Sequence, residues 1–452
     1  MARVDFQAAS DGPGLTPRVG ASARVVFMAG AMIFVGMIVS DRIRVSLDRQ
    51  PVILSASPLI FAFLGLAVAF FRRDLREISR SLWIAIGSTV LLCVFGSLVA
   101  VAAGLPATQI LAGWISYAGP VPGLLLGYAL GAWVEPRLFL SWVKWTLAFV
   151  VLYAMFQQFG ILPKTAVLEG APTTRGVLDE SYRFDYSAGP FRTASTLSIF
   201  LASACVVHIC GHGSRKRGLP TLVTTVLLLL GIVASVMAAR RSGLAMLLGA
   251  AFPYVLLTAT RTAARLALLF IPIALFAASY RLDVADDVAH ELEGKLVHST
   301  TRIGASRRFS QNLVMEEKDT RLVTVLGTGL GSVGTGVRAG GRQASMKAKW
   351  RSERHPLLHF GWFKDLVGFG PFGLLLRFLM FGALMAATWP SRRLRAAGIA
   401  WRWTPFGFVV MTSVIYLLIA TSWLQSISGG ICFGLAIGFG VGALQRAERE
   451  VP

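Results

Sequence analysis

Twelve apolar runs fill most of the sequence, and they limit what the chain can fold into more than any other feature. Each run is close to the length that an α-helix needs to cross about 30 Å of hydrocarbon at about 1.5 Å per residue. The composition agrees, because 55% of the residues are hydrophobic and only 15% are charged, outside the balance of a soluble domain. We therefore expect an all-α polytopic membrane protein with about 12 transmembrane helices, and we exclude a cytosolic enzyme or a protein with a single anchor. The expected spans are residues 25-40, 51-71, 82-102, 108-134, 138-159, 193-211, 219-239, 242-260, 265-280, 369-388, 404-422 and 428-445.

The distribution of Lys and Arg assigns a side of the membrane to each loop. With the N-terminus in the cytoplasm, the cytoplasmic loops and tails hold 19 Lys or Arg, against 5 in the short outer loops, as the positive-inside rule expects. Both termini are therefore expected to be cytoplasmic. The net charge of +21 would suggest a nucleic-acid partner in a soluble protein, but in a membrane protein it reflects sidedness, and no nucleic acid is expected.

This topology divides the chain into tails, spans and two long outer loops. The segments are a cytoplasmic tail (1-24), spans one to five (25-159), an outer loop (160-192), spans six to nine (193-280), a large extracytoplasmic loop (281-368), spans ten to twelve (369-445) and a cytoplasmic tail (446-452). Within the large loop, residues 283-297 have the apolar spacing of a short amphipathic helix, whereas residues 338-354 are strongly basic. In the fourth span, Gly119-Pro120 and Pro122-Gly123 predict a kink or a partly re-entrant segment.

Several arginines lie on the outer side, against the general trend. Arg240 and Arg241 occupy a very short turn between spans seven and eight, and Arg183 and Arg192 flank the outer end of span six. A guanidinium group is always charged and presents a planar fork of donors that matches phosphate oxygens. Several such groups at one surface suggest a site for a pyrophosphate. The alternative is that they reach toward lipid headgroups.

One further arginine lies inside an expected span. Arg377 falls within span ten, where a charge that faced lipid would cost about 2.5 kcal/mol or more. We therefore expect Arg377 to face a groove or a partner.

Two histidines precede span ten. His355 and His359 share a helix face with Phe363 and Leu366, and Pro356 suits the first position of a helix. Histidine exchanges a proton near neutral pH, so it suits the activation or orientation of a hydroxyl group. The alternative is a structural hydrogen bond.

The segment around the second histidine resembles a motif of the O-antigen ligase and polymerase family of bacterial envelope glycosyltransferases. In that family a histidine is followed, after one polar residue and nine variable ones, by Gly-x-x-Gly. The chain has the same spacing at His359, Phe360, residues 361-369, Gly370 and Gly373. It departs from the motif at Phe360, where the family has a small polar residue, and at Gly368, where the family often has an acid.

Three further segments are similar to family motifs and occur in the family's order. Gly189-Pro190-Phe191 looks like its Gly-x-Phe segment, Arg241-Ser242-Gly243 like its Ser-Arg-Gly segment, and Gly327-x-Gly-x-Gly331 like its glycine run.

The resemblance implies an inverting, metal-independent transfer of a glycan on the periplasmic face of the bacterial inner membrane. The donor would be a polyprenyl (undecaprenyl) diphosphate carrier, and the acceptor a hydroxyl of a lipid A core or of a growing polysaccharide. Arg241, with Arg192 or Arg183, would stabilise the leaving diphosphate, and His359 would accept a proton from the attacking hydroxyl or orient it. Arg240 would assist at the diphosphate, and Arg377 would line the groove of the carrier. Contacts to the glycan or acceptor would come from His355, Arg338, Arg342, Arg351 and Arg354. No cofactor is implied.

Two readings from other classes stay open, as does the choice between ligase and polymerase. A transporter or flippase of an anionic lipid-linked glycan would also use many spans and an intramembrane arginine. We find no paired glycine- or proline-broken spans in corresponding halves of the sequence, which argues against it. A binding or assembly subunit would use the basic stretch 338-354 to hold an acidic polysaccharide.

A zinc site at Cys205, His208, Cys210 and His212 is disfavoured. Residues 205, 208 and 212 share one helix face, but Cys210 does not lie on it.

Overall fold

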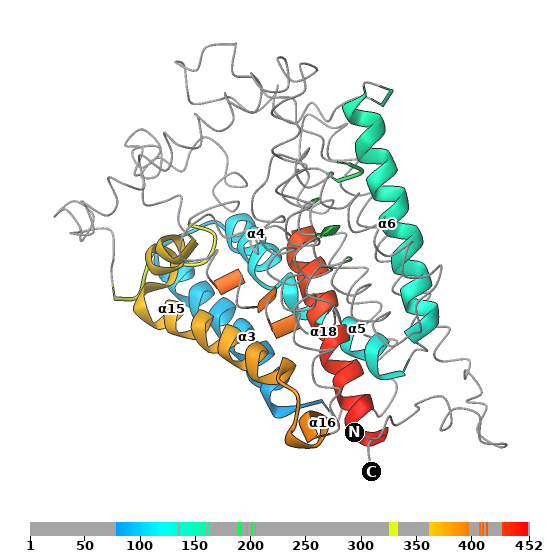
Figure 1. Cartoon of the computed structure of the whole chain (residues 1–452). Coiled ribbons are helices and arrows are strands. Elements are labelled where there is room, and N and C mark those ends of the chain that lie inside the picture. Colours follow the sequence, from blue (N-terminus) through cyan, green and yellow to red (C-terminus); the bar gives the residue numbers. More distant parts are fainter. Residues whose placement is uncertain are drawn as a thin grey trace, which may run out of the picture.

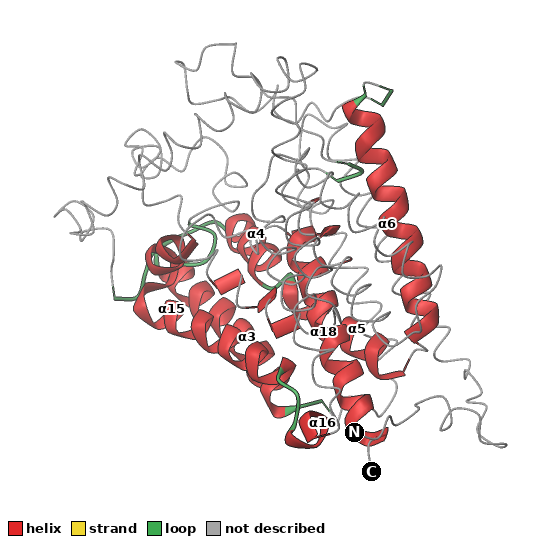
Figure 2. Cartoon of the chain, viewed as in Figure 1, coloured by secondary structure: helices red, strands yellow, loops and turns green. Residues whose placement is uncertain are grey.

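A computed structural model of the 452-residue chain gives the arrangement of its central and C-terminal helices. The structure describes residues 78–133, 136–159, 161–162, 189–191, 325–332, 361–396 and 427–450. It also describes scattered residues from 197 to 204 and from 406 to 414. This part of the chain is all helical (Figure 2). Its helices are α3 (Arg80–Ala102), α4 (Ala107–Tyr117), α5 (Pro120–Trp133), α6 (Pro136–Gln158), α15 (Gly361–Thr388), α16 (Arg392–Ala396) and α18 (Ile427–Glu450).

Four of the described segments are long and apolar enough to cross a membrane. They are Arg80–Ala102, Ala107–Ala132, Gly361–Thr388 and Gly429–Arg449, and α6 adds a shorter apolar stretch, Val143–Gln157. The helical class and the membrane character expected from the sequence are thereby confirmed for this part of the chain. The N-terminal tail 1-24, spans one, two and seven to nine, and nearly all of the two long loops lie outside the described residues.

The helix boundaries follow from local capping chemistry. The Ser79 hydroxyl accepts a hydrogen bond from the backbone N–H of Leu82 and caps the start of α3. At the other end, Gly104 takes a positive φ of 68°, and the N–H of Leu105 bonds to the carbonyl of Ala100. This left-handed ending turns the chain into α4, because glycine adopts the conformation without strain.

The expected kink in the fourth span is confirmed. The helix stops at Tyr117 and resumes at Pro120, so the span consists of α4 and α5 with Ala118 and Gly119 between them. Proline is tolerated in the first turn of α5 because those N–H groups have no partner inside the helix.

Four of the described helices pack as two pairs (Figure 1). The first pair, α3 and α15, runs antiparallel, since Phe95 contacts Phe372 and Gly96 contacts Phe369. The start of α15 therefore lies beside the end of α3, and we call this side of the bundle the loop end. The opposite side, which we call the arginine end, holds Arg80 and α16, and the backbone N–H of Ser391 there bonds to Glu448 of α18.

The second pair, α5 and α18, runs parallel and is held by glycines at every fourth position. On each helix, a Cβ at these glycines would collide with a backbone carbonyl of the other helix. Small residues at this spacing let two membrane helices approach until their backbones touch. The residues are Gly123, Gly127 and Gly131 on α5, and Gly434, Gly438 and Gly442 on α18.

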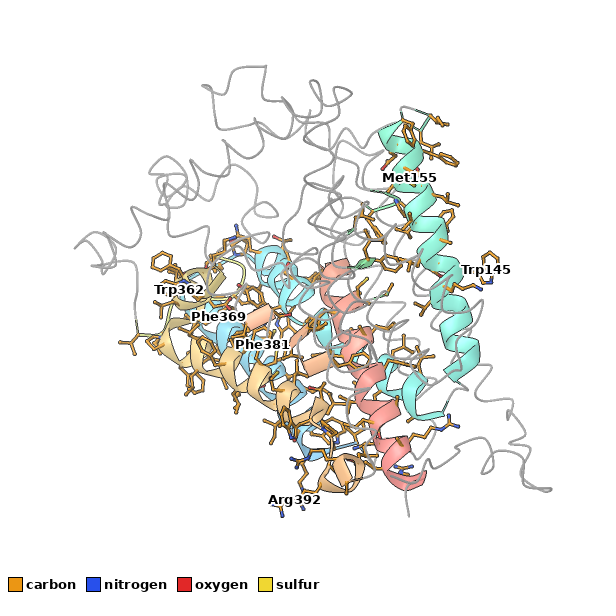
Figure 3. The ribbon with its side chains drawn as sticks, in the orientation of Figure 1. Trp145, Met155, Trp362, Phe369, Phe381 and Arg392 are labelled. Carbon is orange, nitrogen blue, oxygen red and sulfur yellow. The ribbon has the colours of Figure 1, made fainter. Side chains whose placement is uncertain are left out.

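The outward faces of the helices are apolar. Trp145 projects away from the bundle and is 67% exposed, whereas Phe381 points among the helices and is 1% exposed (Figure 3). Leu98 and Val101 on α3 and Leu375 on α15 are likewise exposed. Large apolar side chains over whole helix faces suit contact with lipid, and this arrangement leaves polar chemistry to the interior and the helix ends.

Candidate functional site

Most of the site residues expected from the sequence lie outside the described residues. These are His355, His359, Arg183, Arg192, Arg240, Arg241, Arg338, Arg342, Arg351 and Arg354. The structure does describe Arg377, and it describes three of the four segments that resemble family motifs. It also fixes two neighbours in the chain, since Arg192 follows Phe191 directly and α15 begins two residues after His359.

Helix α15 begins at Gly361, ahead of the expected start at residue 369, and it is broken at Gly370. Gly370 has φ 67° and ψ −174°, which interrupts the helical path, and the next residue is Pro371. Proline has no N–H, so the carbonyl of Val367 loses its usual partner four residues later. At membrane depth, such a freed carbonyl must be satisfied by other protein groups or by water in a cavity.

The glycine run supplies the missing hydrogen bonds. The backbone N–H of Thr328 donates to the carbonyl of Val367 over 2.9 Å, and the Thr328 hydroxyl donates to the same oxygen over 3.0 Å. The N–H of Gly329 donates to the carbonyl of Gly368 over 2.8 Å. The segment 325–332 thus completes the break in α15.

The same segment is anchored to α3 and α4. The N–H of Leu330 donates to the carbonyl of Gly96 over 2.8 Å, and the Leu330 side chain is fully buried. A Cβ at Gly331 would collide with the carbonyl of Gln109. Glycine is also required by conformation at Gly329 and Gly331, where φ is 92° and 84°.

Two of the motifs that resemble the family are therefore in direct backbone contact. A Cβ at Gly327 would overlap the backbone of Gly368, and one at Gly370 would overlap the carbonyl of Val325. The glycine run and the Gly-x-x-Gly segment are separated in the sequence, but together they form one structural unit at the loop end (Figure 1).

The third motif packs against α6. Gly189 has φ 60°, and a Cβ there would lie against Leu197 and Ala154. Phe191 is fully buried and contacts the ring of Phe200 at 5.3 Å between centroids. This packing fixes the backbone immediately before Arg192.

Arg377 faces a partner inside the bundle. Its Nε donates to Oδ2 of Asp365 over 3.0 Å, and the two side chains are 1% and 0% exposed. The Tyr117 hydroxyl donates to Oδ1 of the same carboxylate over 3.1 Å. The Arg377 guanidinium also lies over the Tyr117 ring, with Cζ 5.0 Å from the centroid. A carboxylate paired in this way avoids the cost of an isolated buried charge.

Two buried polar side chains, one of them in this network, are incompletely satisfied. Nη2 of Arg377 has no hydrogen-bond partner in the described part of the chain, and neither does the amide of the fully buried Gln109. Nη1 of Arg377 approaches the sulfur of Met380 at 3.9 Å, which is a weak contact. Arg377 can therefore offer one strong donor to an additional acceptor, and its role in carrier binding stays a prediction.

The two interrupted spans meet at this network. Tyr117 is the last residue of α4, and its ring packs edge-on against Phe369, directly before the break in α15, with the centroids 4.9 Å apart. The contact between Tyr117 and Phe369 is buried in an apolar cluster with Leu92, Cys93 and Leu330. In the sequence we found no paired broken spans in corresponding halves; in the described residues, the helical path is interrupted between Tyr117 and Pro120 and again at Gly370.

Sequence reasoning missed Asp365 and Tyr117. A usable signal was present, since a buried arginine in an apolar span requires a counter-charge, and Asp365 is the nearest acid before it. Asp365 lies about one helical turn before Gly368, the position at which the sequence departs from the family motif by lacking an acid.

Metal ligands do not gather in the described residues. No three His, Cys, Asp or Glu side chains in that part of the chain lie close enough to hold a metal ion. The group Cys205, His208, Cys210 and His212 lies outside it.

Comparisons with known proteins gave no match. No family model fits the sequence, and no curated protein and no solved structure is significantly similar to the chain. The resemblance to the ligase and polymerase family therefore stays an expectation from the sequence.

Proposed function

We propose that this protein is a membrane glycosyltransferase of the O-antigen ligase or polysaccharide polymerase type. It moves a glycan from an undecaprenyl-diphosphate carrier to a hydroxyl of an acceptor glycan, on the periplasmic face of the inner membrane. The acceptor is a lipid A core or a growing polysaccharide. The basic residues at the arginine end, among them Arg80, Arg392 and Arg395, agree with a cytoplasmic location for that end.

The observation that carries the proposal is the contact between the glycine run and the Gly-x-x-Gly segment. Both segments were selected from the sequence for their similarity to one family, and their backbones are joined by hydrogen bonds. Helix α15 begins two residues after His359, and its first residue, Gly361, lies at the end of the bundle opposite Arg80. That location suits chemistry on the outer face of the membrane.

The proposed chemistry uses charge stabilisation and one proton acceptor. As the bond between the sugar C1 and the diphosphate oxygen breaks, negative charge grows on the leaving group. Arg241, with Arg192 or Arg183, stabilises this charge more strongly in the transition state than in the ground state. His359 accepts the proton of the attacking hydroxyl or orients it. A single displacement at C1 inverts its configuration.

The test is transfer by purified protein with a lipid-linked glycan and an acceptor. His359→Ala and Arg241→Ala should each abolish product formation while the protein remains folded in the membrane. Arg80→Ala is the matched control, because it removes an arginine at the arginine end, and it should leave transfer unchanged. Transfer retained by both the His359 and the Arg241 variant would discard the mechanism.

The meeting of two interrupted spans around a buried ion pair favours one further candidate, a transporter of an anionic lipid-linked glycan. Transporters build binding sites near mid-membrane from broken helices and place ionisable residues there. This candidate predicts that vesicles containing the protein move the carrier-linked glycan across the bilayer and form no new glycosidic bond. Product formation without such movement supports the transferase.

A further inference from the structure

The ion pair between Asp365 and Arg377 bridges the break in α15. Asp365 lies in the half-helix before Gly370, and Arg377 lies in the half-helix after it. Continuous helices hold their direction through hydrogen bonds between successive turns, but these bonds are interrupted at Gly370. The angle between the two half-helices therefore depends on groups that span the break.

The bridging groups are strong and are tied to a third element. The bond from Nε of Arg377 to Asp365 is charge-assisted and shielded from water, which strengthens it. The Tyr117 hydroxyl, from α4, donates to the other carboxylate oxygen, and the Tyr117 ring packs edge-on against Phe369. The amino-terminal half of α15 is thereby fixed to α4 as well as to its own second half.

We propose that Asp365, Arg377 and Tyr117 are positioning residues, whose network sets the direction of the amino-terminal half of α15 and thereby the place of His359, two residues before that helix. This inference rests on the proposed function, because it assigns the network a part in glycan transfer. The three side chains act through the helix and not on the reacting atoms. Loss of the Asp365 charge or of the Tyr117 hydroxyl should impair turnover more than carrier binding.

The kinetic test uses variants that change little in shape. Asp365→Asn removes the charge, and Tyr117→Phe removes only the hydroxyl. Each should lower kcat, by up to about 100-fold for a displacement near 1 Å, while KM for the lipid-linked glycan stays within about twofold. Ser88→Ala is the control, because it also removes a buried hydroxyl, which donates to the Ala85 carbonyl of its own helix, α3.

A structural test measures the bend in α15 and does not depend on enzymatic activity. Spin labels are attached to a full-length chain without its native cysteines, at positions 364 and 389, which lie on either side of the break. In a continuous helix the backbones of these two positions would be about 38 Å apart, so a bend shortens this distance. Labels at Leu375 and Trp389 both follow the break and serve as the reference pair; both side chains are exposed. Asp365→Asn should broaden or shift the first distance and leave the second unchanged.

Exchange of the charges separates positioning from general packing. The double variant Asp365→Arg with Arg377→Asp should recover part of the distance distribution and of kcat relative to either single exchange. An unchanged 364–389 distance in Asp365→Asn, or a loss confined to KM, would overturn the inference. A wild-type protein without transfer activity would instead refute the proposed function, and the spin-label distances would still show whether the network sets the bend.

Discussion

The backbone N–H of Gly329 bonds to the carbonyl oxygen of Gly368 over 2.8 Å, so a loop residue satisfies a carbonyl freed by the break in a membrane helix. This bond explains why irregular backbone is stable at that depth, where unsatisfied carbonyls are costly. It also makes the loop and the helix break interdependent. A substitution on either side should disturb both.

Gly329→Ala should therefore destabilise the protein. The residue has φ 92°, and a Cβ would overlap Ala100 of α3. Strain and overpacking together should cost about 1 to 3 kcal/mol. Unfolding of the purified protein in detergent micelles measures this cost. Gly87→Ala is the control, since its Cβ meets open space on α3; equal losses in both variants would show that the loop does not dock as described.

Leu330→Ala should uncover Cys93. Both side chains are fully buried in one apolar cluster, and truncation of a buried leucine costs about 2 to 5 kcal/mol. With Cys93 as the remaining cysteine, its rate of maleimide labelling should rise about tenfold for each 1.4 kcal/mol lost from the closed state. Leu326→Ala changes an exposed leucine of the same segment and should not alter the rate. Protection of Cys93 in the Leu330 variant would contradict the docking of the glycine run.

Gly127→Ala should separate α5 from α18. A Cβ at this position would collide with the carbonyl of Leu435, and backbone atoms cannot move aside as a flexible side chain can. We expect a loss of about 1 to 3 kcal/mol, typical of overpacking. Gly382→Ala in α15 has open space around it and should be neutral or stabilising by up to about 1 kcal/mol. Equal stability of Gly127→Ala and wild type would argue against the close approach of the two helices.

The sequence predicted the helices well because their signal is local. The apolar runs at 82-102 and 138-159 coincide closely with α3 and α6, since hydropathy and helix length are read within one segment. The prolines after Tyr117 likewise predicted the interruption of the fourth span. The glycines of α5 and α18 carried a contact signal that we did not use.

The contacts inside the candidate site could not be predicted from local sequence in this way. The bonds from the glycine run to α15 depend on two segments that are distant in sequence, and only their resemblance to motifs singled them out. The pairing of Arg377 with Asp365 was missed because residue 365 was assigned to the outer loop, ahead of the expected span. A boundary error of a few residues therefore concealed the counter-charge.

The ion pair provides the sharpest test of the helix interior. Replacement of one partner leaves the other charge buried and unpaired, so Asp365→Leu and Arg377→Met should each cost about 3 to 5 kcal/mol. The double variant removes both charges and should cost less than the sum by about 2 kcal/mol or more.

Unfolding free energies in mixed detergent micelles complete this double-mutant cycle. The reference pair is Arg377→Met with Ser88→Ala, because Ser88 bonds to its own helix and has no part in the network. The losses of unfolding free energy in those two variants should add within about 0.5 kcal/mol. Equal additivity for Asp365→Leu and Arg377→Met would mean that the two charges do not stabilise each other across the break. The half-helices of α15 would then be held by other contacts, among them the bonds from Thr328 and Gly329.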